Sequence, residues 1–499
     1  MNIAQAKEQI ESAMRAYFTK DEFGAYRIPI EKQRPVFMVG PPGIGKTAIM
    51  EQIAAELGVG LVSYSITHHT RQSALGLPYI TEKEYGGKNY QVTEYTMSEI
   101  IGSIYDLMRE TGVTEGILFL DEINCVSETL APCMLQLLQY KVFGQHRVPP
   151  GWILVTAGNP PEYNKSVRDF DIVTWDRLKR IDVEPDHEVW KEYAYKKGVH
   201  ASVTTYLAAR KKDFYKVENT AEGKRFVTAR GWDDLSEMIK LCEENGLKVD
   251  ELLVCQYLQD PRIAKDFAVY YDLFNKYRSD YEVEKIVDGT VSESIVLRAQ
   301  RAAMDERLSL LGLIFDCVTD KLKAVCESEK VLELLTTVLR EIKARSFGSP
   351  LPELLEGQIN AQNEKLQSGQ RASSIAPQKQ REMKRLLLAL GKLRAACIRE
   401  PEAGFKPVED GFAQELQKLR EAAAEGSRGL DNAFAFCERA FADGDEVLIF
   451  VTELTANYYS ARFIGRYGCD RYYLHNKQLQ FGERRQEIER RLDELDLDL

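Results

Sequence analysis

The sequence GPPGIGKT at residues 40–47 matches the pattern G-x-x-x-x-G-K-[ST] of a phosphate-binding loop. In such a loop, backbone N–H groups surround the phosphate oxygens, and the N-terminus of the following helix adds positive potential. Gly45 lets the backbone approach a phosphate without a Cβ atom in the way. We expect the Lys46 ammonium to contact the β and γ phosphates and the Thr47 hydroxyl to face Mg²⁺.

The segments on either side of this loop have the pattern that such a site requires. Residues 35–39, PVFMV, form a short apolar run that predicts a buried strand. Apolar residues four positions apart, at Ile49, Ile53 and Leu57, then predict a helix over 48–57. A strand, a glycine-rich loop and a helix in this order favour a nucleotide site over a chance match to a short pattern.

Strands and helices continue to alternate up to about residue 185. By apolar runs and helical spacing, we expect strands at 61–66, 117–120 and 152–157 and helices at 97–108 and 130–139. Hairpins are expected at 77–95, with Gly86 and Gly87 as the turn, and around residues 143–145. This alternation predicts an α/β fold with a parallel sheet that helices cover on both faces.

Beyond residue 185 the strand signals stop, and the chain is expected to be helical almost to its end. Leu335, Val338 and Ile342 share one helical face, as do Leu386, Leu390, Leu393 and Cys397, which is typical of helix–helix packing. Residues 357–380 are polar, which favours a linker. The predicted order is an α/β core at 1–185, a helical lid at 186–280, a helical extension at 281–356, a polar linker at 357–380 and a helical region at 381–499.

The composition is that of an ordinary globular protein. The chain has 499 residues and a formal net charge of −11, so a broadly basic surface for nucleic acid is not expected. No apolar run approaches the ~18 residues that span a bilayer, and the first residues lack the apolar segment of a secretory signal. The nine cysteines include no C-x-x-C pair, which favours reduced thiols and a cytoplasmic location.

Acidic and amide side chains follow two of the predicted strands. Asp121 and Glu122 end the run GILFLDE, and Asn159 follows the strand at 152–157. Because ligands bind at the carboxyl ends of parallel strands, we expect Asp121 to hold Mg²⁺ through a water and Glu122 to orient and deprotonate the attacking water. Asn159 would hydrogen-bond the γ-phosphate or that water, although an N-P dipeptide is also common in turns.

Four segments carry a family resemblance: GPPGIGKT at 40–47, LFLDEIN at 118–124, TAGNP at 156–160 and WDRLKR at 175–180. With the weaker match TARGWDDLS at 228–236, the chain resembles AAA+ ATPases, and within them the MoxR group, over about residues 5–275. The resemblance implies an α/β P-loop core with a helical lid, and ATP and Mg²⁺ as cofactors. The implied nucleotide-binding residues are Gly40, Pro41, Pro42, Gly43, Ile44, Gly45, Lys46, Thr47 and Ala48 (Walker A) and Asp121 (Walker B), with Thr47 and Asp121 at the metal.

The resemblance also implies catalytic roles for Glu122, Asn159, Arg177 and Arg230. Arg177 matches the arginine finger, which reaches the nucleotide of a neighbouring copy, and Arg180 is a competing candidate for that role. Arg230 matches the sensor 2 arginine of the lid, which contacts the γ-phosphate within its own copy. Either arginine could instead be an ordinary surface residue or part of a structural ion pair.

The chain departs from the MoxR pattern at a few positions. Cys125 stands where a basic residue is usual, Leu178 replaces phenylalanine, and Thr228-Ala229 precedes Arg230 in place of Ser-Pro. None of these changes removes a catalytic group, so they indicate a divergent branch.

In the family, the two predicted hairpins face a central pore. The resemblance therefore implies substrate contacts for Tyr85, Tyr90, Phe143 and Arg147, while packing of the hairpins on a neighbouring copy is the alternative.

The implied function is Mg²⁺-dependent ATP hydrolysis by a ring of copies, expected to be a hexamer, that remodels or matures a client protein. Relatives commonly act with a protein that carries a von Willebrand factor A domain, and we expect residues beyond 275 to bind it. One alternative is an ATP-gated scaffold with little turnover, which would have no need of Glu122. Another is a nucleic-acid motor, which the net charge disfavours despite the basic run Lys379, Arg381, Lys384, Arg385, Lys392 and Arg394.

Overall fold

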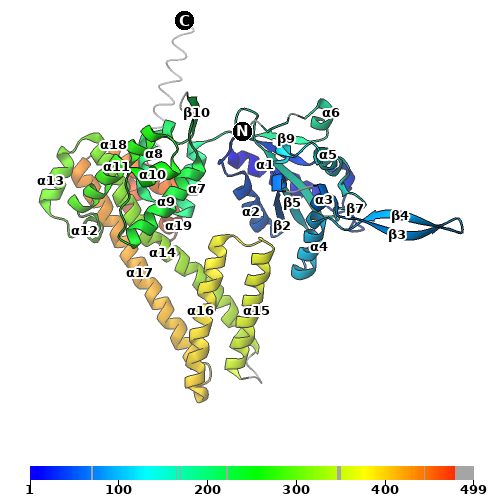
Figure 1. Ribbon diagram of the computed structural model, residues 1–499. Coiled ribbons are helices and arrows are strands. Elements are labelled where there is room, and N and C mark those ends of the chain that lie inside the picture. The colour runs from blue at the N-terminus through cyan, green and yellow to red at the C-terminus, as the bar shows by residue number, and fades with distance from the viewer. Residues whose placement is uncertain are drawn as a thin grey trace, which may run out of the picture. The chain divides into compact units, whose positions relative to one another are not determined.

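The computed structural model describes residues 1–68, 71–164, 166–168, 170–220, 223–345, 350–442 and 444–477. The chain divides into two compact units. The first unit contains residues 1–189 and 358–387, and the second contains residues 190–357 and the described residues from 388 onward. Figure 1 colours the chain from its N-terminus to its C-terminus.

The first unit is built on a five-stranded parallel sheet, which confirms the predicted α/β fold (Figure 1). Its strands are β1 (Val36–Val39), β2 (Gly60–Ser65), β5 (Gly116–Asp121), β8 (Trp152–Gly158) and β9 (Lys179–Asp182), in the spatial order β2-β5-β8-β1-β9. The sequence did not predict β9, because three of its four residues are charged. As an edge strand it pairs only with β1, and it buries only Ile181.

The helices of the first unit pack on the sheet and on one another. They are α1 (Ile3–Tyr17), α2 (Lys46–Leu57), α4 (Glu99–Thr111) and α5 (Ala131–Tyr140), together with the short α3 (Arg71–Leu75) and α6 (Ile172–Trp175). The buried face of α4 includes Ile100 and Ile104, which share one core with Leu118 of β5 and Leu154 of β8. Each such side chain contributes about 1.5–3 kcal/mol when it is buried. This core holds β5 and β8 in register.

Two hairpins extend from the first unit, as predicted. In the longer one, β3 (Pro78–Tyr85) and β4 (Lys88–Tyr95) are joined by a turn of two glycines with positive φ, and the hairpin projects far from the sheet (Figure 1). At its base, Leu77 and Thr96 pair through their backbones. The shorter hairpin consists of β6 (Val142–Phe143) and β7 (His146–Arg147).

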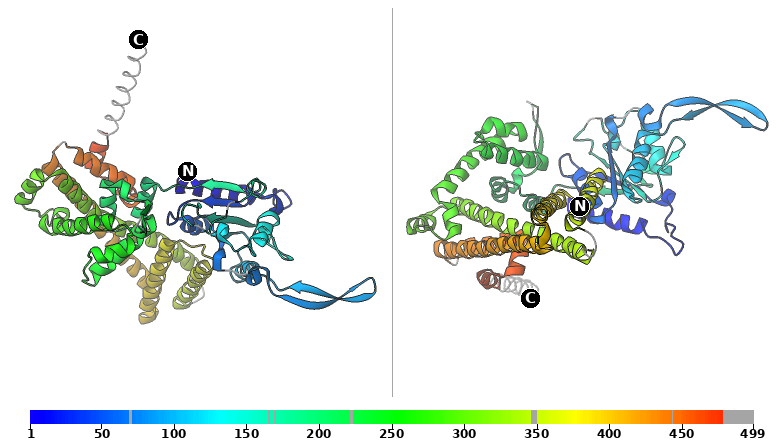
Figure 2. Two further views of the ribbon diagram at one scale, coloured as in Figure 1. Left: turned by 45° about the horizontal axis from the view of Figure 1, so that its top comes forward. Right: turned by 90° about the horizontal axis from the view of Figure 1, so that it is seen from below.

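The chain beyond the sheet is largely helical, as predicted. Its helices include α7 (His187–Lys197), α8 (Ala201–Ala209), α9 (Ala229–Glu244), α10 (Glu251–Tyr257), α11 (Pro261–Asp280), α12 (Val283–Asp288), α13 (Glu293–Arg301), α14 (Met304–Arg345), α17 (Lys406–Phe441), α18 (Asp445–Ala456) and α19 (Tyr458–Tyr467). The long helices α14 and α17 pack side by side (Figure 2). No helix in the described ranges combines the length and the apolarity that a membrane span requires.

A hairpin interrupts this helical region, so the expectation of no strand beyond residue 185 was wrong. It consists of β10 (Lys216–Thr220) and β11 (Gly223–Val227). Val217, Phe226 and Val227 are its only large apolar residues among the described ones, which is too few for the alternating apolar pattern that predicts a strand. The predicted lid and extension, 186–280 and 281–356, fall almost entirely in the second unit, and their boundaries stay predictions.

Helices α15 (Leu351–Arg371) and α16 (Pro377–Arg399) occupy the segment predicted as a polar linker at 357–380. The linker prediction was wrong, because the glutamine, glutamate and lysine residues of this segment have good helix propensity. Only residues 372–376 separate the two helices. The predicted packing stripes are confirmed, since Leu335, Val338 and Ile342 of α14 and Leu386, Leu390, Leu393 and Cys397 of α16 are all buried.

The base of the long hairpin provides a test of these contacts. A Cβ atom at Gly76 would lie 2.0 Å from the Thr96 carbonyl oxygen, whereas a Cβ atom at Gly86 would meet no described heavy atom within 4 Å. Both glycines have positive φ. We predict that Gly86→Ala costs about 1–2 kcal/mol of backbone strain, and that Gly76→Ala adds a further ~1–3 kcal/mol because the backbone must move.

Thermal unfolding and limited proteolysis of the hairpin would measure the difference between the two variants. Equal unfolding temperatures and equal cleavage rates would contradict the packing described for the hairpin base.

Candidate nucleotide site

The loop at 40–47 connects β1 to α2 at the carboxyl edge of the sheet. Gly43 and Gly45 have φ values of +74° and +94°, which glycine adopts without strain. A Cβ atom at Gly40 would lie 2.7 Å from the carbonyl oxygen of Val183, so the loop must pass close to that backbone. Gly45 caps α2 without a side-chain hydrogen bond, which leaves the first N–H groups of the helix accessible to an anion.

Lys46 lies at the centre of the site and is only 8% exposed. Its ammonium donates hydrogen bonds to the carbonyl oxygens of Gly40 (2.7 Å) and Pro41 (2.9 Å) and to Oδ1 of Asn159 (3.0 Å). Asn159 follows β8, which lies beside β1 in the sheet. The structure therefore brings together the loop lysine and the asparagine that the sequence placed at the ends of different strands.

The carboxylate of Asp121, at the end of β5, contacts both the loop and its own neighbour. The Thr47 hydroxyl donates to its Oδ2 at 3.2 Å, and the backbone N–H of Glu122 donates to its Oδ1 at 2.9 Å. A hydroxyl and a carboxylate at this separation supply the oxygen ligands that Mg²⁺ prefers.

Glu122 has a φ of +56°, a left-handed conformation that costs energy for a residue with a Cβ atom. Its Oε2 accepts hydrogen bonds from Thr67 Oγ1 at 2.9 Å and from Ser65 Oγ at 3.3 Å. Ser65 ends β2, where it pairs in register with Asp121. Among the described residues, Oε1 of Glu122 has no hydrogen-bond partner.

Sequence reasoning missed Ser65 and Thr67. Part of the signal was available, because both hydroxyls stand at the polar end of the strand predicted at 61–66. The pattern does not specify that this strand lies beside the one that ends at Asp121.

Asn124 is a third residue that sequence reasoning left without a role. Its amide donates to the carbonyl oxygen of Asn159 at 2.8 Å, and a Cβ atom at Gly158 would lie 2.4 Å from its Oδ1. The N–H of Gly40 donates to the Gly158 carbonyl oxygen at 3.2 Å. Asn124 thus joins the segment after β5 to the segment after β8, and the β8 end is in turn joined to the phosphate-binding loop.

Cys125 stands where the MoxR pattern, which this segment resembles, has a basic residue. Burial raises the pKa of its thiol, and the nearby carboxylates of Glu122 and Asp121 raise it further. The side chain is therefore a neutral thiol at physiological pH, and Asn164 Nδ2 contacts its sulfur at 3.3 Å.

The two arginine-finger candidates, Arg177 and Arg180, differ in the contacts of their side chains. Nε of Arg180, in β9, donates to both carboxylate oxygens of Asp182, at 2.9 and 3.0 Å, and its guanidinium lies 4.7 Å from the ring centroid of Trp175. Arg177 follows α6 and is exposed, and within the described part of the chain its side chain makes no hydrogen bond or ion pair. Both arginines are exposed, and among the described residues Arg180 has an ion-pair partner whereas Arg177 has none.

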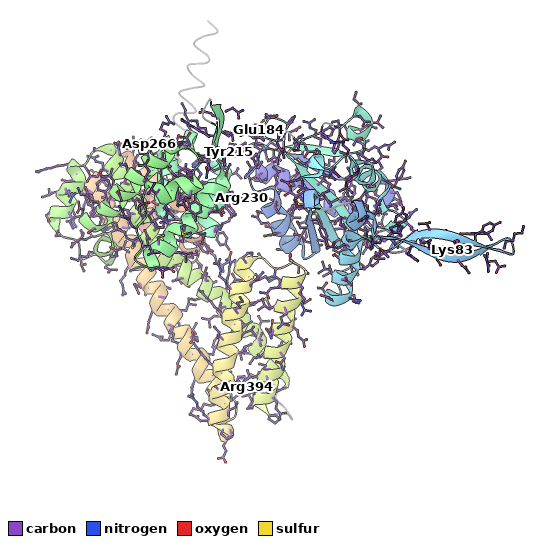
Figure 3. All side chains as sticks on the ribbon, viewed as in Figure 1. Lys83, Glu184, Tyr215, Arg230, Asp266 and Arg394 are labelled. Atoms are coloured by element: carbon purple, nitrogen blue, oxygen red, sulfur yellow. The ribbon has the colours of Figure 1, made fainter. Side chains whose placement is uncertain are left out.

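Arg230 is exposed in the first turn of α9 (Figure 3), in the second unit. Its contact with a γ-phosphate therefore stays a prediction. The Thr228 hydroxyl caps α9 by accepting from the Gly231 N–H at 3.2 Å.

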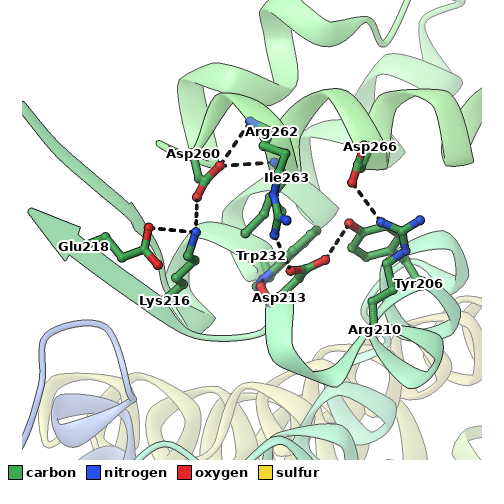
Figure 4. A network of polar contacts seen from close by, with 10 residues as sticks. All are labelled: Tyr206, Arg210, Asp213, Lys216, Glu218, Trp232, Asp260, Arg262, Ile263 and Asp266. Carbon is green, nitrogen blue, oxygen red and sulfur yellow. Dashed lines mark hydrogen bonds and ion pairs between the residues drawn. The ribbon is translucent and has the colours of Figure 1, made fainter. Parts of the chain in front are cut away.

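A polar network holds the start of α9 and the neighbouring hairpin (Figure 4). Asp260 accepts from Lys216 Nζ at 3.0 Å and from the N–H groups that begin α11. The Trp232 indole donates to the Asp213 carbonyl oxygen at 3.2 Å, and the Asp213 carboxylate accepts from the Tyr206 hydroxyl at 3.0 Å. The α9 turn that carries Arg230 thus has a fixed position within its unit.

The hairpin residues expected to contact a substrate do not all lie at the surface. Tyr85 and Tyr90 are 55% and 51% exposed on the long hairpin, with ring centroids 6.2 Å apart. Phe143 is fully buried in the core of the first unit, so its predicted substrate contact was wrong: its apolar ring packs inward from β6. Arg147 forms an ion pair with Glu31 at 2.8 Å.

Comparison with known protein families supports this description. Residues 35–178 match the family model of the AAA domain of the dynein-related subfamily. The match contains the loop at 40–47, Asp121, Glu122, Asn159 and Arg177, so the first unit contains an AAA domain, a P-loop domain of a family whose members bind nucleotides.

Among solved structures, NtrX from Brucella abortus in complex with ADP is similar to this chain. Sequence identity is 16% and the TM-score is 0.22, over 40% of this chain and 44% of that chain. The chain thus spans less than half of NtrX, and a likeness at this level supports no functional conclusion. No curated protein sequence matches the chain.

The position of Lys46 predicts a loss of nucleotide affinity when it is replaced. Removing charge-assisted hydrogen bonds costs about 1.5–3 kcal/mol each, so Lys46→Ala should weaken binding of a fluorescent ATP analogue about 10- to 100-fold. Lys88→Ala, which changes an exposed lysine of β4, is the matched control. Equal affinities of the two variants would contradict the assignment of the phosphate-binding loop.

Proposed function

We propose that the chain is a Mg²⁺-dependent ATPase of the MoxR type, which works as a ring of copies, a hexamer, and remodels or matures a client protein. The observation that carries this proposal is the convergence of Lys46, Thr47, Asp121, Glu122 and Asn159 at one edge of the sheet. The AAA family match over residues 35–178 supports the ATPase class, to which MoxR proteins belong.

Each side chain at this edge suits one part of phosphate-ester hydrolysis. Lys46 would bind the β and γ phosphates, and the Asn159 amide beside it would bind the γ-phosphate or the attacking water. Thr47 and Asp121 would hold Mg²⁺, which offsets the negative charge of the phosphates when it is bound.

Glu122 would be the general base. Because Ser65 and Thr67 anchor Oε2, the other carboxylate oxygen is oriented and can accept the proton of the attacking water.

A ring of copies is supported by the difference between the two arginines. In a ring, an arginine finger stabilises charge on the phosphoryl group of the nucleotide bound to the neighbouring copy. Such an arginine must be exposed on its own copy. Arg177 is exposed and meets that requirement, whereas Asp182 and Trp175 hold Arg180.

The client would bind through the exposed tyrosines of the long hairpin, Tyr85 and Tyr90, and hydrolysis would move the lid against the α/β core. As in other MoxR-type ATPases, the partner would be a protein with a von Willebrand factor A domain, which binds residues beyond 275. A nucleic-acid motor has less support, because the net charge is −11 and Arg394 of the basic run is paired with Glu356.

Turnover distinguishes an ATPase from a nucleotide-gated scaffold. We predict Mg²⁺-dependent phosphate release by the purified protein, and a loss of at least ~100-fold in Glu122→Gln, which keeps the shape of the side chain but removes the base. Nucleotide affinity should be unchanged in this variant. Equal rates in the wild type, Glu122→Gln and Lys46→Ala would refute hydrolysis, and ATP-dependent assembly without phosphate release would favour the scaffold.

The finger assignment is tested by comparing Arg177→Ala with Arg180→Ala. An arginine finger is worth about 10³–10⁵ in turnover, so Arg177→Ala should lose most activity while it still binds nucleotide. Arg180→Ala should stay within a few-fold of the wild type, because its partners lie in its own chain.

Mixing Arg177→Ala with Lys46→Ala should restore part of the activity, since each copy supplies what the other lacks. Absence of any recovery, together with stable mixed assemblies, would place the arginine in its own active site instead.

A further inference from the structure

The connection between α15 and α16 lies against the edge of the sheet in the first unit. β2 forms this edge, and the backbone N–H of Leu61 in β2 donates a hydrogen bond to the carbonyl oxygen of Ala372 at 3.1 Å. Ala372 is 1% exposed and belongs to the same core as Val62 of β2 and Leu107 of α4. A segment more than three hundred residues further along the chain thus supplies a partner for an edge-strand N–H group.

The connection has a defined conformation. A Cβ atom at Gly369 would lie 2.0 Å from Cδ1 of Ile375, so the last turn of α15 allows the chain to fold closely back on itself. Gln380 Nε2 donates to the Ile375 carbonyl oxygen at 3.0 Å, and Ser373 adopts a left-handed conformation with a φ of +50°. This fixed tip, residues 369–376, presents the Ala372 carbonyl oxygen to β2.

β2 also leads directly to the residues that hold Glu122. Ser65 is its last residue, and Thr67 lies in the 3-10 turn that follows, Ile66–His68. Both hydroxyls donate to Glu122 Oε2. The tip contact at Leu61 and the contacts with Glu122 therefore lie at opposite ends of one short strand.

We infer that the tip at 369–376 is a positioning element for Glu122, which acts through β2 and lets the helical part of the chain control ATP turnover. The inference rests on the proposed role of Glu122 in hydrolysis. Helices α15 and α16 continue from the tip into the second unit, at residues 357 and 388. A ligand or partner that displaces these helices would move the tip, loosen β2 and misplace the carboxylate.

The nucleotide-binding groups lie on elements other than β2. Lys46 and Thr47 belong to α2, Asp121 to β5, and Asn159 follows β8, and none of the three elements receives the Ala372 hydrogen bond. Loss of the tip contact should therefore lower kcat for ATP and leave KM and the number of ADP sites per chain unchanged. General unfolding of the domain would instead lower kcat and the number of ADP sites together, because unfolded chains bind no nucleotide.

The test uses full-length protein and three substitutions. Ala372→Asp places a carboxylate in the apolar contact with β2, and Gly369→Val forces Ile375 out of the tip without touching β2. Ser373→Asp is the matched control, because it adds the same charge at an exposed position whose left-handed backbone aspartate tolerates. Steady-state ATPase kinetics, the affinity and stoichiometry of ADP binding, and hydrogen exchange of the Leu61 amide and of residues 65–67 are measured for each.

We expect both tip variants to exchange the Leu61 amide and residues 65–67 at least ~10-fold faster than Ser373→Asp. We also expect kcat to fall about 10-fold with KM, ADP affinity and the number of ADP sites per chain unchanged, because small misplacements of a reacting group are costly. Unchanged exchange at Leu61 in both variants would show that the tip is not docked in solution. Faster exchange with an unchanged kcat would show that the tip does not position Glu122.

Failure of the proposed function would look different. If the wild type released no phosphate, hydrolysis itself would be refuted, and exchange at residues 65–67 would alone decide whether the tip restrains the segment that binds Glu122.

Discussion

The position of one ammonium group determines much of this site. Lys46 is almost completely buried, and its charge is stabilised by the carbonyl oxygens of Gly40 and Pro41 and by the Asn159 side chain. A buried ammonium is costly unless it is hydrogen-bonded, so these acceptors must stay in place around it. They come from the ends of β1 and β8, which only a parallel sheet in this register brings together. The strand order that defines the fold is therefore also the condition for a buried ammonium at this position.

Several residues near Lys46 adopt conformations that the rest of the domain must stabilise. Glu122 has a positive φ, and Gly158 has no space for a Cβ atom because Asn124 packs against it. A strained backbone such as that of Glu122 persists only where the surrounding packing determines it. Here the buried apolar strands β5 and β8 supply that packing, and the left-handed Glu122 directly follows β5.

The sequence predicted those features that depend on neighbouring residues. The phosphate-binding loop, the buried strands, the two glycine-centred hairpins and the pairing of Asp121 with Thr47 all follow from local pattern and parallel-sheet geometry. The charged edge strand β9 and the hairpin β10–β11 were missed, because edge strands need few apolar residues. Ser65, Thr67 and Asn124 were missed because their roles depend on which strands are adjacent, which no local pattern specifies.

The polar stretch at 357–380 is another segment whose structure the local sequence pattern does not predict. Its composition is that of a linker, and only one small apolar residue, Ala372, enters the core of the first unit. A single alanine gives no periodic signal, yet its carbonyl oxygen satisfies an edge-strand N–H group. An open strand edge attracts other chains, so a domain that builds its active site beside such an edge gains by covering it with its own helices. The covering segment is then connected through the short strand β2 to the hydroxyls that bind Glu122, the proposed general base.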